Sequence, residues 1–184
     1  MAESALNESD YQQHTQQWVK DFVVEYNICP FAKRELERGT IRYHVATSDD
    51  VEVLLQQLIS ECQLLDDQAD IETTLFIVPA LKDFHDYLDM LYWAEKLVSK
   101  QGYDGIYQLA SFHPDYCFGG AEQDDPSNYT NRSPYPTLHL IREQTISRLA
   151  KLHPDPEGIP ERNIQLTEEM GNTSLKQLLA SCKV

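Results

Sequence analysis

The sequence is poor in basic residues and has no nucleotide-binding motif, and each absence narrows the possible functions. It has 15 Lys and Arg residues against 30 Asp and Glu residues, which gives a formal net charge of −15. Phosphate contacts need clustered Lys and Arg, so this balance argues against a nucleic-acid partner and against anionic membrane surfaces. Neither a G-x-G-x-x-G pattern nor a P-loop occurs, so no motif supports nucleotide binding.

Long apolar runs and paired cysteines are also missing. No run approaches the ~20 apolar residues of a membrane span. The N-terminal stretch MAESALNESDYQQH has neither the basic start nor the apolar segment of a signal peptide. The cysteines Cys29, Cys62, Cys117 and Cys182 form no C-x-x-C pair. We therefore expect a cytoplasmic protein with free thiols and no membrane association.

What is present is typical of a globular protein. The sequence is 41% hydrophobic and 24% charged, and its 184 residues suit a single domain over 1–184. Residues 1–9 are polar, and we expect them to be disordered. The tail 172–184 is expected to form at most a short helix.

The periodicity of apolar residues predicts an α/β fold, with α+β as the alternative. Strand-like stretches at 41–47, 73–78 and 106–112 alternate with helical stretches of crossover length. Such crossovers favour parallel pairing. We predict a small three-stranded, mainly parallel β-α-β-α-β sheet with flanking N-terminal and C-terminal helices, the first of which covers 10–26. The polar face of the first strand suggests an edge position or a sheet that is only partly covered.

The segment from Ser111 to Glu143 has the highest density of reactive residues, and its first half leaves the third strand. In open α/β sheets, ligands bind beyond the carboxyl ends of the strands, where His113 and Asp115 follow directly. We predict that His113 is a catalytic acid or base and that Asp115 orients it. The alternative is a structural His113 that holds the loop through backbone hydrogen bonds.

The second half of this segment is predicted to enter a helix at Ser133. A helix N-terminus offers free N–H groups to an anion, and Arg132 adds a bidentate donor. We predict that Asn131, Arg132 and Ser133 bind the substrate, which is then an anionic small molecule. The alternative is that Ser133 only caps the helix while Arg132 pairs with Asp124 or Asp125.

On the predicted helix, His139, Arg142 and Glu143 lie at i, i+3 and i+4 and share a face. His139 and Arg142 are therefore predicted to line the same substrate cleft. His139 and Glu143 also have the spacing of a helical metal pair, which His113 and Asp115 would complete. No H-E-x-x-H motif supports this metal-binding alternative.

Cys29 is a possible nucleophile, because a thiol near cationic groups ionises more readily. It follows the first predicted helix, whose negative C-terminal dipole would raise its pKa, and Lys33 and Arg34 would offset that effect. The alternative is a small buried hydrophobic residue.

A non-catalytic alternative is a protein-binding module. The loop 113–136 contains Tyr116, Phe118, Tyr129 and Tyr135, and aromatic residues of this kind anchor protein interfaces. An exposed, flat arrangement of these rings would favour this function over an enzyme.

Several spaced motifs together resemble the bacterial family catalogued as domain of unknown function 1415. They are NICPFAK at 27–33, SFHPDY at 111–116, DDP at 124–126, NYTNRSPYPTLHL at 128–140 and PERNI at 160–164. The resemblance covers roughly 18–171 and implies a bacterial, cytoplasmic protein. It implies no activity, cofactor or oligomeric state, so the leading hypothesis of a small enzyme for an anionic molecule rests on the residues above.

Overall fold

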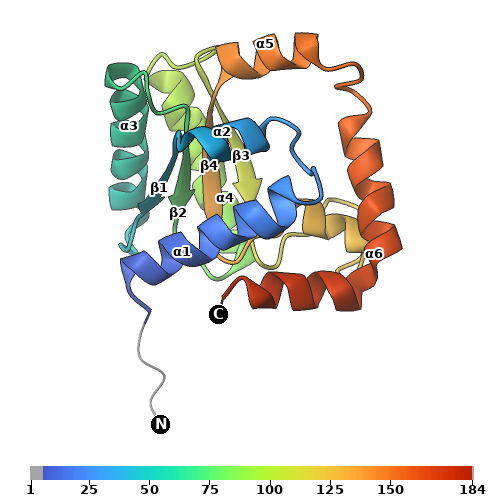
Figure 1. Cartoon of the computed structure of the whole chain (residues 1–184). Coiled ribbons are helices and arrows are strands. Elements are labelled where there is room, and N and C mark those ends of the chain that lie inside the picture. The colour runs from blue at the N-terminus through green and yellow to red at the C-terminus, as the bar shows by residue number, and fades with distance from the viewer. Residues whose placement is uncertain (1–5, 184) are drawn as a thin grey trace.

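A computed structural model describes residues 6–183, and it shows a four-stranded sheet between two layers of helices (Figure 1). The strands are β1 (Ile41–Val45), β2 (Thr73–Ile77), β3 (Tyr107–Phe112) and β4 (Thr137–Arg142). The class is mixed α/β, as predicted. Among the described residues, no helix is both long enough and apolar enough to cross a membrane.

The sheet has the order β1-β2-β4-β3, and β4 is the strand that the sequence pattern did not predict. β1 pairs with β2 in parallel, whereas β4 is antiparallel to both β2 and β3. The three predicted strands therefore run in one direction, but β4 separates β2 from β3. The prediction of a three-stranded, mainly parallel sheet is wrong, because two of the three pairings are antiparallel. The edge position of β1 is confirmed.

The helix predicted to begin at Ser133 is also wrong, because 137–142 is β4. Leu138 and Leu140 are fully buried on one face of this strand, while His139 and Ile141 lie on the other. This alternation has a period of two, but Leu138, Ile141 and Thr145 also fit helical spacing, which explains the error.

One face of the sheet is covered by α3 (Val51–Asp67) and α4 (Phe84–Lys100). Asp50 accepts hydrogen bonds from the first turn of α3, and Asp83 does so for α4, so both helices start where their cap residues place them. Phe76 of β2 is fully buried in the main hydrophobic core between these helices and the sheet.

The other face is covered by helices from 8–38 and from 126–181, which are called the chain-end helices (Figure 1). These elements are α1 (Glu8–Trp18), the π-helix η1 (Val19–Val24), α2 (Ala32–Arg38), the 3-10 helix η2 (Pro126–Asn131), α5 (Glu143–Leu152) and α6 (Ile159–Ser181). Asn7 and Asp10 form a reciprocal capping box, so Glu8 and Ser9 are helical rather than disordered. Residues 1–5 of the stretch expected to be disordered lie outside the described residues. The tail continues α6 beyond a kink at Gly171.

We predict that Phe76→Ala destabilises the protein by about 3–5 kcal/mol, because it leaves a cavity in the core under α3 and α4. Urea unfolding followed by circular dichroism measures this change. Tyr92→Ala is the control, since Tyr92 is 54% exposed on α4 and its loss is expected to cost about 0.5 kcal/mol or less. Equal losses for the two variants would contradict the assignment of this core.

Candidate functional site

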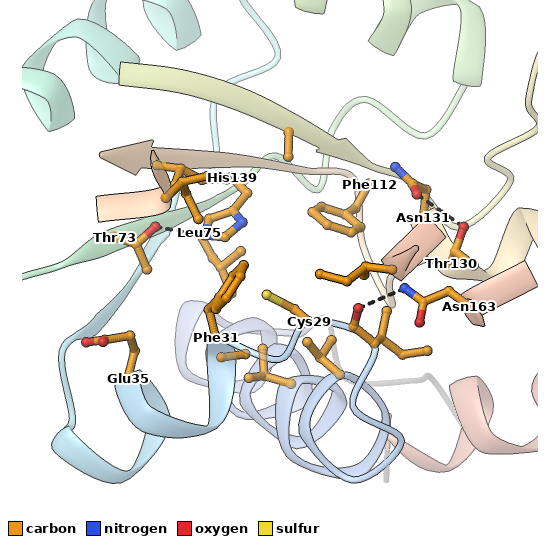
Figure 2. Close-up of a pocket in the computed structure, with 18 of the residues that line it drawn as sticks. Cys29, Phe31, Glu35, Thr73, Leu75, Phe112, Thr130, Asn131, His139 and Asn163 are labelled. Atoms are coloured by element: carbon orange, nitrogen blue, oxygen red, sulfur yellow. Dashed lines mark hydrogen bonds between the residues drawn. The ribbon is translucent and has the colours of Figure 1, made fainter. Parts of the chain in front are cut away.

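A cavity of about 630 Å³ lies between the sheet and the chain-end helices (Figure 2). Its floor is the sheet face that carries Thr73, Leu75, Phe112 and His139, and its opposite wall includes Cys29 in the turn before α2. Helices α5 and α6 contribute further apolar side chains at its sides. This volume lies in the range of small-molecule sites, which are about 300–1,000 Å³.

Strand register determines the floor of the cavity. His139 of β4 pairs with Leu75 of β2 on one side and with Ala110 of β3 on the other. Side chains of directly paired residues point to the same face, so these three line the cavity together. The small Ala110 leaves space above the sheet centre, where a larger residue would fill it.

His139 is the central polar group of the floor. Its Nε2 is 2.7 Å from the Thr73 hydroxyl oxygen, and that hydroxyl donates its hydrogen to the Leu140 carbonyl at 2.6 Å. Because Thr73 has only one hydroxyl hydrogen, His139 Nε2–H must be the donor to Thr73. The Nδ1 atom is then an acceptor. Burial lowers the pKa of His139 to about 4, so the ring is neutral at pH 7.

Cys29 points into the cavity from the wall opposite the sheet (Figure 2). The sequence placed it only near a helix C-terminus, but it also precedes the unpredicted helix α2. Burial raises the pKa of the Cys29 thiol, and the backbone N–H groups of Phe31 and Ala32 counteract this only in part. The thiol therefore stays protonated at neutral pH.

One end of the cavity is held by amides that bind backbone carbonyls. Asn131 donates to the Ser111 carbonyl at 2.9 Å, and Asn163 of α6 donates to the Ile28 carbonyl at 2.8 Å. Figure 2 shows both side chains together with Thr130 at this end. These bonds join η2 to β3 and α6 to the wall that contains Cys29.

The other end is acidic. Glu35 of α2 and Glu72, which precedes β2, both line the cavity. Glu35 is 7% exposed and accepts a hydrogen bond of 2.6 Å from the Thr40 hydroxyl, while Arg34 lies 3.5 Å from it on the outer side. Among the described residues, no Lys or Arg lines the cavity.

Of the residues predicted from the sequence, Cys29, Asn131 and His139 line this cavity. The predicted site residues outside its lining are His113, Asp115, Arg132, Ser133 and Arg142. Glu35, Glu72 and Thr73 were not predicted from the sequence. The alternation within β2 and β4 was the signal for Thr73, but it is usable only once β4 is recognised as a strand.

His113 is fully buried behind the loop that it begins. Its Nε2–H donates to the Leu81 carbonyl at 3.1 Å, and its Nδ1 accepts from the Asp115 backbone N–H at 3.0 Å. The ring also packs against Phe84 and Tyr87. Burial lowers the pKa of His113, and both ring nitrogens are already bonded to backbone groups. This geometry agrees with the structural alternative.

Arg132 and Ser133 also bind backbone carbonyls. Arg132 is 8% exposed and donates to the carbonyls of Tyr116 at 3.0 Å and Gln123 at 2.8 Å. The Ser133 hydroxyl donates to the Tyr135 carbonyl at 2.6 Å. Since no helix begins at Ser133, the positive helix end required for the predicted anion cradle does not exist.

Arg142 and Glu143 likewise do not share a helical face with His139. Arg142 ends β4 and donates to the carbonyls of Leu65 and Ile71, and Glu143 begins α5. The predicted i, i+4 metal pair is therefore wrong, because its first member is on a strand. Within 6–183, no three His, Cys, Asp or Glu side chains are arranged to hold a metal ion.

The loop aromatics proposed as protein anchors point mainly inward. Tyr129 is 7% exposed and packs under Arg132, and Tyr116 packs against Phe84 and Phe118. Phe118 lines the cavity. Tyr135 lies 2.7 Å from a ring nitrogen of His14 on α1. Apart from Phe118, which is 37% exposed, the rings stabilise the loop more than they form an outward-facing surface.

The chain with this fold and cavity was compared with known protein families. The model of the family described as "Protein of unknown function (DUF1415)" matches residues 10–177, so the chain belongs to this family, as its motifs predicted. No curated protein matches the chain, and no solved structure matches it. The function must therefore be inferred from the geometry of the cavity.

We predict that His139 makes stability fall as the medium is acidified. Its pKa is about 4 in the folded protein and about 6.5 in the unfolded chain, so between these values only the unfolded state takes up the proton. Above the pKa of the unfolded chain, His139 does not change the free energy of unfolding with pH. As the pH falls to about 4, proton uptake by the unfolded state lowers the free energy of unfolding by up to about 3 kcal/mol. The difference in unfolding free energy between wild type and His139→Gln, measured from about pH 7 to about pH 4.5, isolates it. A pH-independent difference would refute this state of His139.

We predict that His113→Ala lowers stability by roughly 2–4 kcal/mol, because it removes a buried ring and leaves two backbone groups without partners. The affinity of the folded variant for an apolar probe, decanol, should be unchanged. Urea unfolding and calorimetric titration measure the two quantities. His85→Ala is the control, since the His85 side chain is 91% exposed. Loss of binding with full stability would instead support the catalytic prediction for His113.

Proposed function

We propose that this protein binds a small, mostly apolar molecule in the cavity between the sheet and the chain-end helices. The observation on which this proposal depends is the cavity itself, whose volume of about 630 Å³ suits a ligand rather than a packing defect. Native cores contain few voids larger than a water molecule, so an apolar space of this size is itself informative. Polar groups occur at a few places on its wall, where they would fix the orientation of a ligand.

The proposed ligand differs from the anionic molecule expected from the sequence. Arg132 and Arg142, the cations of that hypothesis, are bonded to backbone carbonyls outside the cavity lining. A buried anion needs a paired cation or several donors, and two carboxylates would repel it. A neutral or positively charged ligand is therefore the better match.

The π-helix η1 in the cavity wall supports a functional role for the cavity. Val19 and Val23 of η1 line the cavity beside Trp18 of α1. A π-helix is a less stable backbone arrangement than an α-helix and occurs frequently at functional sites. Here it is part of the wall that faces the sheet.

A second candidate function is an enzyme that uses the Cys29 thiol. Cys29 and His139 project into the cavity from opposite walls (Figure 2). A neutral imidazole with an available Nδ1 is a suitable base for a thiol. The raised pKa of Cys29 makes binding the primary proposal, and a substrate that draws the two groups together would be needed for chemistry. A bacterial, cytoplasmic setting remains part of the proposal.

We predict that a bound ligand shields Cys29 from alkylation. Decanol serves as a probe, and iodoacetamide labelling is followed by mass spectrometry of each cysteine. Cys29 labelling should fall at least about fivefold at saturating decanol, because the thiol faces the occupied space. Cys117 is the internal control, since it is partly exposed and does not line the cavity. Equal labelling of Cys29 with and without decanol would refute binding at this place.

A further inference from the structure

Hydrogen bonds and chain neighbours connect the residues at the acidic end of the cavity. The Thr40 hydroxyl donates to Glu35, and the Thr40 carbonyl accepts from the Glu72 backbone N–H at 2.9 Å. Thr73 follows Glu72, and its hydroxyl lies 2.7 Å from His139. Figure 2 shows Glu35, Thr73 and His139 on the same side of the cavity.

The side-chain atoms left available at this end are hydrogen-bond acceptors. The Thr73 hydroxyl hydrogen is used by Leu140, and His139 uses its Nε2–H on Thr73, which leaves His139 Nδ1 as a lone-pair acceptor. Ionised Glu35 and Glu72 only accept hydrogen bonds. One Glu72 oxygen, Oε1, is buried and has no hydrogen-bond partner among the described residues.

An unpartnered buried carboxylate oxygen is costly, and native structures seldom leave one without a reason. The free-energy cost falls if the Glu72 carboxylate rotates towards a donor that has entered the cavity. The donor gains most if it is positively charged, since charge-assisted hydrogen bonds are about twice as strong as neutral ones. No cation of the described chain lines the cavity to take this place.

We propose that the ligand is an amphiphilic amine, with an ammonium head at the Glu35, Glu72 and His139 end and an apolar body along the Cys29 wall. This inference rests on the proposed binding function and specifies its ligand. An amine head donates up to three hydrogen bonds, which matches an end built from acceptors. The apolar body would contact Leu75, Phe112 and the isoleucines of α6.

The test compares three probes with the same chain length, decylamine, decanol and decanoic acid, by calorimetric titration of the full-length protein at neutral pH. We expect decylamine to bind roughly tenfold more tightly than decanol, as one charge-assisted hydrogen bond implies, and decanoic acid to bind most weakly. Glu72→Gln and Glu35→Gln should remove most of the preference for the amine, so that the ratio of decylamine affinity to decanol affinity falls towards one. Both substitutions conserve shape.

Glu37→Gln is the matched control, because Glu37 is on α2 with Glu35 but is exposed and outside the cavity lining. It should keep the full preference for the amine. Equal affinities of amine and alcohol, or an equal loss in all three Gln variants, would overturn the amine assignment while leaving the binding function intact. If none of the three probes binds, the proposed function itself fails.

Discussion

The insertion of β4 between β2 and β3 is the constraint on which the rest of the structure depends. Its hydrogen bonds to both neighbours fix the register of the sheet, and this register aligns His139 with Leu75 and Ala110. A shift by one residue would turn His139 into the core under α3 and α4 and turn Leu140 towards the cavity. The chemistry of the cavity floor is therefore a consequence of backbone pairing.

The two faces of the sheet have different roles because their side chains differ. The face towards α3 and α4 has fully buried large residues such as Phe76 and Leu138, which fill the space between the layers. The opposite face has Thr73, Ala110 and His139 at its centre, which are too small or too polar to form a tight core. A helix layer held at normal packing distance above such residues leaves a cavity.

Hydrogen bonds from α6 hold the turn at 26–28, which leads into the cavity wall that contains Cys29. Asn27 has a left-handed conformation, with φ of 54°, and exposes carbonyls on both sides of the turn. Arg162 of α6 donates to the carbonyls of Tyr26 and Asn27 at 2.9 Å, and Asn163 donates to that of Ile28 at 2.8 Å. These bonds fix the position of the turn relative to α6.

The sequence was sufficient to predict the elements whose signals are local. β1, β2, β3, α3 and α4 were predicted, since Asp50 and Asp83 cap the helices and strands follow each crossover. β4 was missed because its apolar spacing fits both periods, and the correct one is selected only by pairing with β2 and β3. That error left Thr73 unidentified and placed Arg132 and Ser133 in the predicted site.

The contrast between His113 and His139 shows why location after a strand was not enough to find the site. His113 is fully buried and His139 is partly buried, and loss of solvation lowers the pKa of each, so both are neutral at pH 7. His113 has both nitrogens bonded to backbone, whereas His139 is bonded through Nε2 and leaves Nδ1 as an acceptor. A histidine is available for binding only when the surrounding backbone leaves one nitrogen unpaired, and that depends on contacts between distant segments. In this protein, the hydrogen bond between Thr73 of β2 and His139 of β4 occupies Nε2 and leaves Nδ1 as an acceptor on the cavity floor.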